Sequence, residues 1–202
     1  MKHSQAEILR EYGPFPGVER VHGVTYDGQH VWFASGERIN ALDPAAGKVV
    51  RSIDVPADAG TAFDGKYIYQ IAEDRIQKID PETGEVVATI PAPGNGGDSG
   101  LAWAEDTLWV GQHRGRKIYQ IDPESGAILR TIESNRFVTG VTWWTVSFGT
   151  APGKATIAMS GASIRRREKS CNASTCRRAR ACQASSPMGK IGFSAAMAVK
   201  AR

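Results

Sequence analysis

Apolar and polar positions alternate in short runs that recur three times along the chain, each time interrupted by the same turn. Residues 75–90 contain two such runs, joined by the turn Asp80–Gly84. Proline fixes φ early in a turn and glycine accepts positive φ near its end, so this pattern predicts a tight hairpin between two strands. Matching hairpins are predicted over residues 38–53 and 117–132.

A second predicted hairpin precedes each of these three. It begins at a glycine (Gly23, Gly60 or Gly100) and, in the first two copies, reverses at an Asp-Gly dipeptide, which is a strong hairpin signal. A fourth copy begins at Gly140. Each repeat therefore predicts four strands in roughly 40 residues, the size of a propeller blade. The initial glycine is typical of an inner strand that neighbouring backbones approach closely.

We therefore expect an all-β fold, a β-propeller of four-stranded antiparallel blades, over residues 7–143. The expected units are blades at 21–58, 59–98 and 99–137 and the start of a fourth at 138–143. Residues 7–12 resemble the last strand of a repeat, such as Ala127–Ile132, although they precede the first blade. We expect them to add to the last blade and close the ring, which would remove exposed strand edges.

The overall net charge of +4 averages two unlike parts of the chain. Residues 1–143 carry a balance of −6, whereas residues 144–202 carry +10. The second part has no Leu, Asp or Tyr, holds all three cysteines, and shows no four-strand pattern. Two hypotheses account for it: a disordered basic tail, or a reading-frame error.

The frame-error hypothesis makes specific predictions from the codons. If one base was lost just after the Trp143 codon, restoring that base allows the following codons to encode V-D-G-E-L-W-H-G. This segment would supply the missing turn and second strand. The codons of residues 161–171 permit R-R-I-D-P-x-T-G-E-V-L, and those of 181–189 permit another inner strand. The hypothesis implies about three and a half blades of an intended five. A chain shortened in this way is expected to be inactive.

The chemistry suggested by residues 144–202 has little support. Their basic runs resemble nucleic-acid-binding patches, and Cys171, Cys176 and Cys182 resemble part of a metal site. Under the frame-error hypothesis none of these residues was selected for such a role, and no histidine is present there to complete zinc ligation. We expect no metal and no cofactor, and a nucleic-acid binder that acts through the basic tail is the third and least favoured function.

Localisation is predicted from two absences in the sequence. No apolar run approaches the roughly 20 residues of a membrane span. No apolar stretch of the secretory type follows Met1. We therefore expect a cytoplasmic protein that does not contact a membrane.

The chain resembles a known family in its entry segment Ile8–Tyr12 and in hairpins of the form I-D-P-x-T-G-x-V, such as Ile79–Val86. These features are similar to the glutaminyl-peptide cyclotransferases of plants and bacteria, over about residues 7–143. The hairpins are also similar to those of streptogramin-lyase and quinoprotein amine dehydrogenase β-chain-like propellers. The resemblance implies a five-bladed propeller that cyclises N-terminal glutamine to pyroglutamate.

This sequence departs from the family beside the inner-strand glycines. The family carries acidic or amide residues there, whereas this chain has His22, Ala59 and Thr139, and Asp98 is the nearest carboxylate. Cyclisation requires proton transfer to and from nitrogen. His22 and Asp98 are therefore the catalytic candidates, and a hydrogen-bonded structural histidine and a capped turn are the respective alternatives.

The residues beside the glycines are also the predicted channel lining, because the inner strands of a propeller surround its axis. His22, Ser99 and Thr139 are the ligand-binding candidates. By contrast, the recurring Trp32, Tyr69 and Trp109 are interpreted as packing between blades. We expect a small molecule or a peptide to bind in the channel, with glutaminyl-peptide cyclotransferase activity as the alternative function.

Overall fold

The computed structural model describes residues 9–145, 155–159, 162–164 and 198–199. Within these residues all regular structure is β-strand, and three antiparallel sheets of four strands each follow one another along the chain. In each sheet the strands pair in sequence order. This arrangement confirms the predicted β-propeller of four-stranded blades.

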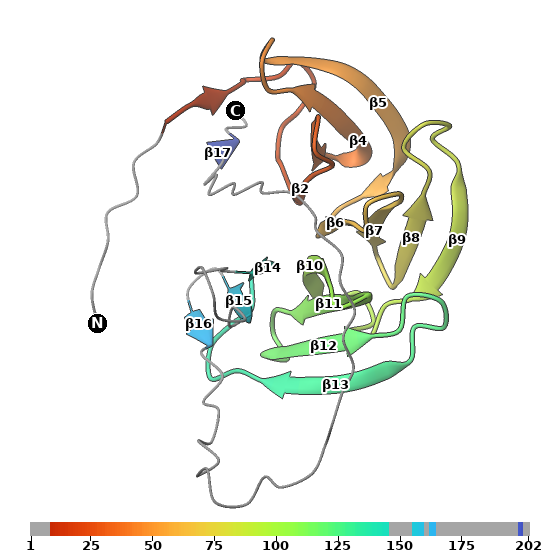
Figure 1. Cartoon of the computed structure of the whole chain (residues 1–202), viewed down its shortest axis with the longest axis vertical. Helices are drawn as coiled ribbons and strands as arrows, with labels where there is room; N and C mark the ends of the chain where they lie inside the picture. Colours follow the sequence, from red (N-terminus) through yellow and green to blue (C-terminus); the bar gives the residue numbers. More distant parts are fainter. Residues whose placement is uncertain (1–8, 146–154, 160–161, 165–197, 200–202) are drawn as a thin grey trace, which may run out of the picture.

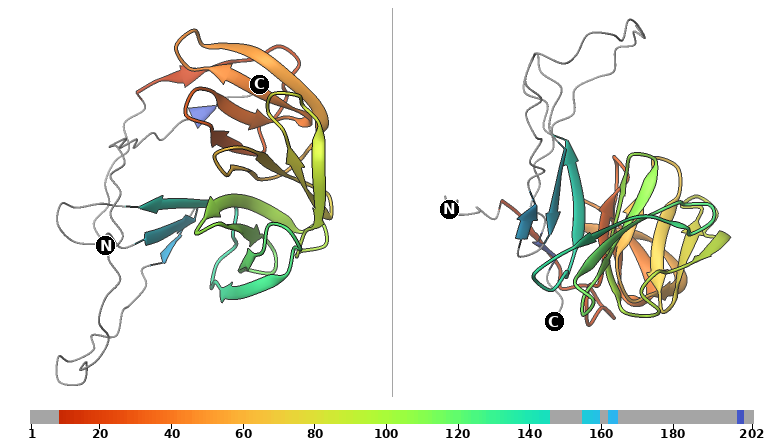
Figure 2. Two further views of the ribbon diagram at one scale, coloured as in Figure 1. Left: turned by 45° about the vertical axis from the view of Figure 1, so that its right-hand side comes forward. Right: turned by 90° about the horizontal axis from the view of Figure 1, so that it is seen from below.

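The strand bounds place the three blades close to the expected residues. The first blade contains β2 (Val24–Tyr26), β3 (Val31–Ala34), β4 (Gly36–Asp43) and β5 (Lys48–Ala57); the second contains β6 (Thr61–Phe63), β7 (Ile68–Ala72), β8 (Arg75–Ile79) and β9 (Val86–Pro91); the third contains β10 (Asp98–Ala104), β11 (Thr107–Gln112), β12 (Lys117–Ile121) and β13 (Ile128–Glu133). Figures 1 and 2 show the sheets arranged around an arc, with β2, β6 and β10 toward its centre and β5, β9 and β13 outside.

The turn between the third and fourth strands is built by its aspartate and glycine. In blade two the Asp80 Oδ1 accepts hydrogen bonds from the amides of Glu82 (2.7 Å) and Thr83 (3.1 Å). The Gly84 amide donates to the Asp80 carbonyl at 2.8 Å, and Gly84 has a φ of +83°. An L side chain rarely adopts that φ, so the sequence requires glycine there. The turns of the other two blades repeat these bonds.

The core lies between the blades. Trp32, Tyr69 and Trp109 occupy equivalent positions in β3, β7 and β11, and all three side chains are buried. Each belongs to a separate hydrophobic cluster that includes residues of the next sheet. The prediction that these aromatics pack between blades is therefore confirmed.

The inner strands approach one another as closely as the repeated glycines predict. A Cβ added to Gly60 would lie 2.4 Å from the backbone nitrogen of Leu101, in the next blade. One added to Gly100 would lie 2.5 Å from the nitrogen of Val141, and Gly23 is similarly close to blade two. These distances are too short for real Cβ contacts, so glycine is required at this step of the repeat.

A fourth sheet begins where the repeat predicts it, at β14 (Val141–Thr145). It continues through β15 (Ala155–Met159) and β16 (Ala162–Ile164), both antiparallel. The remaining described strands, β1 (Glu11–Tyr12) and β17 (Ala198–Val199), pair in parallel. Most of residues 144–202 lie outside the described residues, as do the predicted basic runs and cysteines. The frame-error, disordered-tail and ring-closure hypotheses therefore remain predictions.

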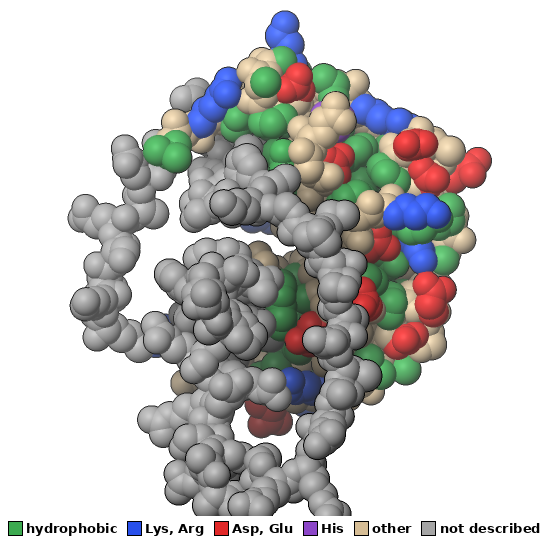
Figure 3. Space-filling view, in the orientation of Figure 1, with side chains coloured by type: hydrophobic (Ala, Val, Ile, Leu, Met, Phe, Trp, Pro, Cys, Tyr) green, Lys and Arg blue, Asp and Glu red, His purple; other side chains and the backbone are tan. Residues whose placement is uncertain are grey.

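Charged and apolar side chains are mixed on the face of the molecule that Figure 3 shows, with acidic, basic and hydrophobic groups interspersed over the part that is coloured. No helix with the length and apolarity needed to cross a membrane occurs in the described part of the chain.

Candidate functional site

The inner strands of the four sheets surround a hollow of about 350 Å³. Each of β2, β6, β10 and β14 contributes the three residues that directly follow its repeated glycine, and Val31 completes the wall. The lining residues are Val24, Thr25, Tyr26, Val31, Thr61, Ala62, Phe63, Leu101, Ala102, Trp103, Val141, Thr142 and Trp143. A concave site where equivalent positions of successive repeats converge is the best candidate for ligand binding.

The hollow is lined by one aromatic residue from each sheet. Tyr26, Phe63, Trp103 and Trp143 all lie three residues after the repeated glycine. Trp143 stacks on the buried Trp109, with the ring centroids 5.6 Å apart, and Trp103 stacks in the same way on the preceding blade. Phe63 packs against the cluster that contains blade one's buried indole. Stacking therefore holds Trp103 and Trp143 in fixed orientations at the wall.

The polar side-chain groups of the lining are hydroxyls and the indole N–H groups of Trp103 and Trp143. Thr61 donates a hydrogen bond to the Gln70 Oε1 at 2.6 Å, and the Gln70 amide nitrogen in turn donates to the carbonyls of Ile71 (2.7 Å) and Ala59 (3.2 Å). Thr61 is therefore committed to the structure of blade two. Thr142 is exposed and lies on the wall. The lining residues include no acidic or basic side chain.

The predicted channel residues lie at the start of the inner strands, and none of them lines the hollow. His22 is exposed, and its backbone amide donates to the Ala34 carbonyl at 3.0 Å. The Ser99 hydroxyl lies 2.6 Å from the Val138 carbonyl and 3.0 Å from that of Gly111, so it links blade three to the approach to β14. Thr139 is exposed. A ligand-binding role for His22, Ser99 and Thr139 remains a prediction.

Asp98 is buried at the first position of β10, with 9% of its surface exposed. Its Oδ2 accepts a hydrogen bond from the Gly94 amide at 2.8 Å, whereas its Oδ1 is buried without a hydrogen-bond partner. Burial raises the pKa of the Asp98 carboxyl, and the Gly94 amide opposes this rise only in part.

The loop before Asp98 causes this burial. Asp58 occupies the same repeat position in blade two, two residues before the glycine, but is exposed. In blade three a Cβ on Gly94 would lie within 3 Å of the Asp98 carboxylate, so only glycine lets the loop wrap so closely around it. Asp98 is therefore a carboxyl that releases its proton less readily than an ordinary aspartate. Such a group can act as a proton donor or acceptor.

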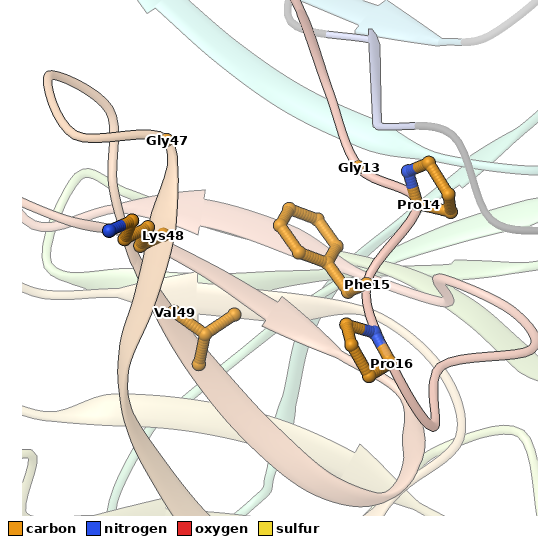
Figure 4. A pocket seen from close by; sticks show the side chains of 7 residues that line it. All are labelled: Gly13, Pro14, Phe15, Pro16, Gly47, Lys48 and Val49. Atoms are coloured by element: carbon orange, nitrogen blue, oxygen red, sulfur yellow. The ribbon is translucent and has the colours of Figure 1, made fainter.

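A second hollow, of about 440 Å³, lies at the edge of blade one. It separates residues 13–16 from Gly47, Lys48 and Val49 (Figure 4). In Figure 4 the Phe15 ring points toward the strand that carries Lys48 and Val49. Lys48 contributes the only charged side chain of this lining. Since no set of polar groups converges there, the inner hollow is the stronger candidate site. Neither the hollows nor the rest of the described residues contain a group of three or more His, Cys, Asp or Glu side chains arranged to hold a metal ion.

The sequence contained a signal for the lining that the prediction did not use. His22, Ser99 and Thr139 were predicted from their position directly before each glycine. The aromatic residue three positions after each glycine recurs just as regularly, in all four copies. Aromatic residues thus recur both on the inner strand and on the second strand of each repeat. This pattern indicates that the two kinds of aromatic residue pack against each other across adjacent blades.

Comparison with known proteins supports the fold. Neither a protein-family model nor a curated protein matches the sequence. Among solved structures, the chain is similar to Myxococcus xanthus glutaminyl cyclase, with a TM-score of 0.55 and 12% identity over 69% of this chain and 67% of that one. It is similar to BBS1N in complex with ARL6DN, with a TM-score of 0.53 and 17% identity over 73% of this chain. It is also similar to the RRP9 WD40 repeats, with a TM-score of 0.51 and 13% identity over 75% of this chain.

These similarities establish the propeller fold and no more, because the sequence identities are low. The chain spans half the length of the BBS1N and RRP9 structures. The resemblance to a glutaminyl cyclase agrees with the family resemblance inferred from the hairpins.

Proposed function

We propose that this propeller of the glutamine cyclotransferase-like type binds a small uncharged molecule, or the apolar side chain of a peptide, in the hollow between its inner strands. The observation that carries the proposal is the composition of that hollow. Four sheets contribute equivalent residues, aromatic rings supply apolar contact area, threonine hydroxyls supply hydrogen bonds, and the lining carries no charged side chain. A charged ligand would lose its hydration without gaining a partner there.

The aromatic wall favours a ring-containing ligand. Trp103 and Trp143 are already stacked on Tyr69 and Trp109, so little rotamer freedom remains to be lost when a ligand binds. A planar ring can contact such a wall over a large area, whereas the threonines fix its orientation. We expect binding without turnover in this chain.

Ligand-observed NMR with two matched probes tests the proposal. Benzyl alcohol is neutral and benzoate is anionic, and both carry the same ring. We expect saturation transfer to benzyl alcohol and little or none to benzoate. Thr142→Phe should abolish the transfer because it fills the hollow, whereas Thr89→Phe, on the outer strand β9, should leave it unchanged. Equal binding of both probes, or no effect of Thr142→Phe, would show that the hollow is not the site.

A second candidate function, glutaminyl-peptide cyclotransferase, is supported by Asp98. In that reaction the α-amine attacks the side-chain amide carbon, a C–N bond forms, the bond to the amide nitrogen breaks, and ammonia leaves. The amine must lose a proton and the leaving nitrogen must gain one. A carboxyl with a raised pKa near the inner strands, such as Asp98, suits such a transfer.

Ammonia release from a Gln-Phe amide separates the two functions. A cyclotransferase would release ammonia, lose this activity in Asp98→Asn, and keep it in Asp58→Asn, which changes the same repeat position on the exposed blade-two loop. If benzyl alcohol binds but no ammonia is released, the binding function stands alone. Release that is unaffected by Asp98→Asn would exclude Asp98 as the proton-transfer group.

A further inference from the structure

Blade three has a longer loop between its second and third strands than blade two. Four residues, 113–116, separate β11 from β12, whereas only residues 73–74 separate β7 from β8. The longer loop reads His-Arg-Gly-Arg and contains no acidic side chain, whereas the shorter loop reads Glu-Asp. The repeat therefore reverses the charge of this loop between blade two and blade three.

The longer loop is fixed by hydrogen bonds to segments that precede and follow it. The His113 amide donates to the Gly97 carbonyl at 3.2 Å, and the Arg116 amide donates to the His113 carbonyl at 3.4 Å. The Arg116 carbonyl accepts from the Ser134 amide at 2.7 Å. Arg116 has a φ of +53°, a conformation that residues other than glycine seldom adopt. The loop therefore presents its side chains from a defined backbone.

Two side chains of this loop contact an exposed phenyl ring. The His113 ring stacks on Phe137, with the centroids 4.9 Å apart and the planes 17° apart. The central carbon of the Arg116 guanidinium lies 5.2 Å from the centroid of the same ring. Phe137 nevertheless remains 52% exposed. The cation–π contact restricts the Arg116 side chain, so that side chain loses less entropy when it pairs with a ligand. Residues 113–116 and Phe137 form one surface, which we call the basic loop surface.

The two arginines of the basic loop surface differ from the arginine beside the equivalent loop of blade two. There, the Arg75 guanidinium lies 3.4 Å from the Glu73 carboxylate. Among the described residues, no hydrogen bond or ion pair uses the guanidinium of Arg114 or Arg116. Both side chains are exposed. Each therefore offers a planar set of N–H donors that matches the geometry of a carboxylate.

The excess positive charge is confined to this loop, which restricts the kind of anion that it fits. Lys117, directly after the loop, lies opposite Glu133 in the ladder between β12 and β13, and residues 1–143 together carry a balance of −6. A long polyanion such as a nucleic acid would extend past the loop onto this acidic remainder and be repelled. A short acidic segment contacts only the loop. The exposed Phe137 ring adds apolar area that a peptide side chain can cover and an inorganic anion cannot.

We propose that the basic loop surface is a docking site for a short acidic segment of a partner protein. Carboxylates of the segment pair with Arg114 and Arg116, and an apolar side chain between them covers Phe137. The partner is thus defined by its chemistry, namely Asp or Glu residues on both sides of an apolar residue. The surface lies where β11 ends and β12 begins, outside the lining of the inner hollow, so the proposal does not depend on what that hollow binds.

Fluorescence anisotropy of labelled peptides, titrated with the full chain at low ionic strength, tests the proposal. The probe is the peptide E-D-L-E-D, and its matched control Q-N-L-Q-N keeps the leucine but has no charged side chain. The titrations compare the wild type, the double variant Arg114→Gln with Arg116→Gln, and Arg75→Gln, which removes the paired arginine beside the equivalent loop. Residues 144–202 are the same in all three chains, so binding to that segment would not distinguish them.

We expect saturable binding of the acidic peptide to the wild type and little binding of the neutral peptide. The double variant should bind the acidic peptide about tenfold more weakly because two charge pairs are lost, whereas Arg75→Gln should bind it as the wild type does. Since Arg114 and Arg116 are exposed, the double variant should keep the wild-type Tm, which shows that the chain is still folded.

Equal affinity of the wild type for the two peptides, or undiminished binding to the double variant, would overturn the proposal. A labelled oligothymidylate that binds more tightly than the acidic peptide, and that depends on the same two arginines, would also overturn it. The basic loop surface would then recognise nucleic acid rather than an acidic protein segment.

Discussion

Blades one and two share the same repeat but differ in what covers them. Blade two lies between two other sheets, and its inner-strand Thr61 and Ala62 are buried. Blade one is covered by blade two on one side. On its other side Tyr12, Phe15 and Val18 pack on the outer part of the sheet, whereas Val24 and Tyr26 of its inner strand are 43% and 44% exposed. In repeat proteins stability arises from each unit and from its interface with the next. The comparison therefore indicates that side chains at equivalent repeat positions contribute differently to stability according to whether an adjacent blade covers them.

The largest expected difference comes from removing one ring at a covered interface and one at the open face. Trp109→Ala removes a buried indole that stacks on Trp143, and should lower the free energy of unfolding by about 3–5 kcal/mol. Tyr26→Ala removes an exposed ring and should cost below about 1 kcal/mol. Urea unfolding measures both. Similar losses in the two variants would contradict the distinction between covered and open faces.

The close approach of the inner strands predicts the next largest effect. Gly60→Ala places a Cβ 2.4 Å from the Leu101 nitrogen and 2.7 Å from the Gly100 carbonyl carbon. Backbone atoms cannot move aside as a flexible side chain can, so the blades must separate slightly. We expect a loss of about 1–3 kcal/mol, as for other overpacked sites. Thermal unfolding checks this expectation, and an unchanged Tm would show that the inner strands are not in contact there.

A difference between blades one and three predicts a stabilising substitution. The Trp32 indole donates a hydrogen bond to the Asp27 Oδ2 at 2.6 Å, whereas the equivalent Trp109 indole nitrogen is buried without a partner. Blade three has Ala104 where blade one has Asp27, in both cases five residues before the tryptophan. Ala104→Asp should therefore supply the missing acceptor and stabilise the fold by about 1 kcal/mol.

A double-mutant cycle isolates that hydrogen bond. In a Trp109→Phe background, Ala104→Asp has no indole to accept from, so its stabilising effect should disappear. A gain that persists without the indole would assign the effect to the turn instead.

The smallest expected effect concerns Asp98 and pH. Because its pKa is raised in the folded chain, the folded state holds this proton more tightly than the unfolded state, whose aspartates titrate near 3.8. The stabilisation that protonated Asp98 contributes is therefore present at low pH, and it is lost as pH rises through the pKa of Asp98 in the folded chain. Asp98→Asn should remove this part of the pH dependence, and Asp58→Asn should retain it. The free energy of unfolding is measured with urea at several pH values. If it varies with pH in the same way in the wild type and in Asp98→Asn, the assignment to Asp98 is wrong.

The sequence predicted the fold well because its signals are local. The Asp-Pro turns, the glycine at each inner strand and the aromatic at each second strand have the same structural role in every copy. The burial of Asp98 could not be predicted in this way. Asp58 and Asp98 occupy the same repeat position, and only the preceding loop distinguishes them, since Gly94 lets the backbone wrap around one carboxylate. That contact depends on a loop conformation that the repeat pattern does not specify.

The position of the hollow along the inner strands was not predicted, and a ligand-binding role for His22, Ser99 and Thr139 stays a prediction. The residues beside the glycines were expected to line the channel, but the hollow is lined by the three residues that follow each glycine. The repeat identified which strands surround the axis. It did not specify how far along them the hollow lies, because that depends on how closely the sheets approach at their ends.

Hydrogen exchange tests directly whether each blade is stabilised by the blade that covers it. Blades one and two provide matched strands in one molecule, β2 and β6, which begin one residue after Gly23 and Gly60. Native-state exchange followed by mass spectrometry compares their amides under identical conditions. We expect faster exchange in β2, whose Val24 and Tyr26 are exposed, than in β6, which is covered on both sides. Equal protection of the two strands would contradict it.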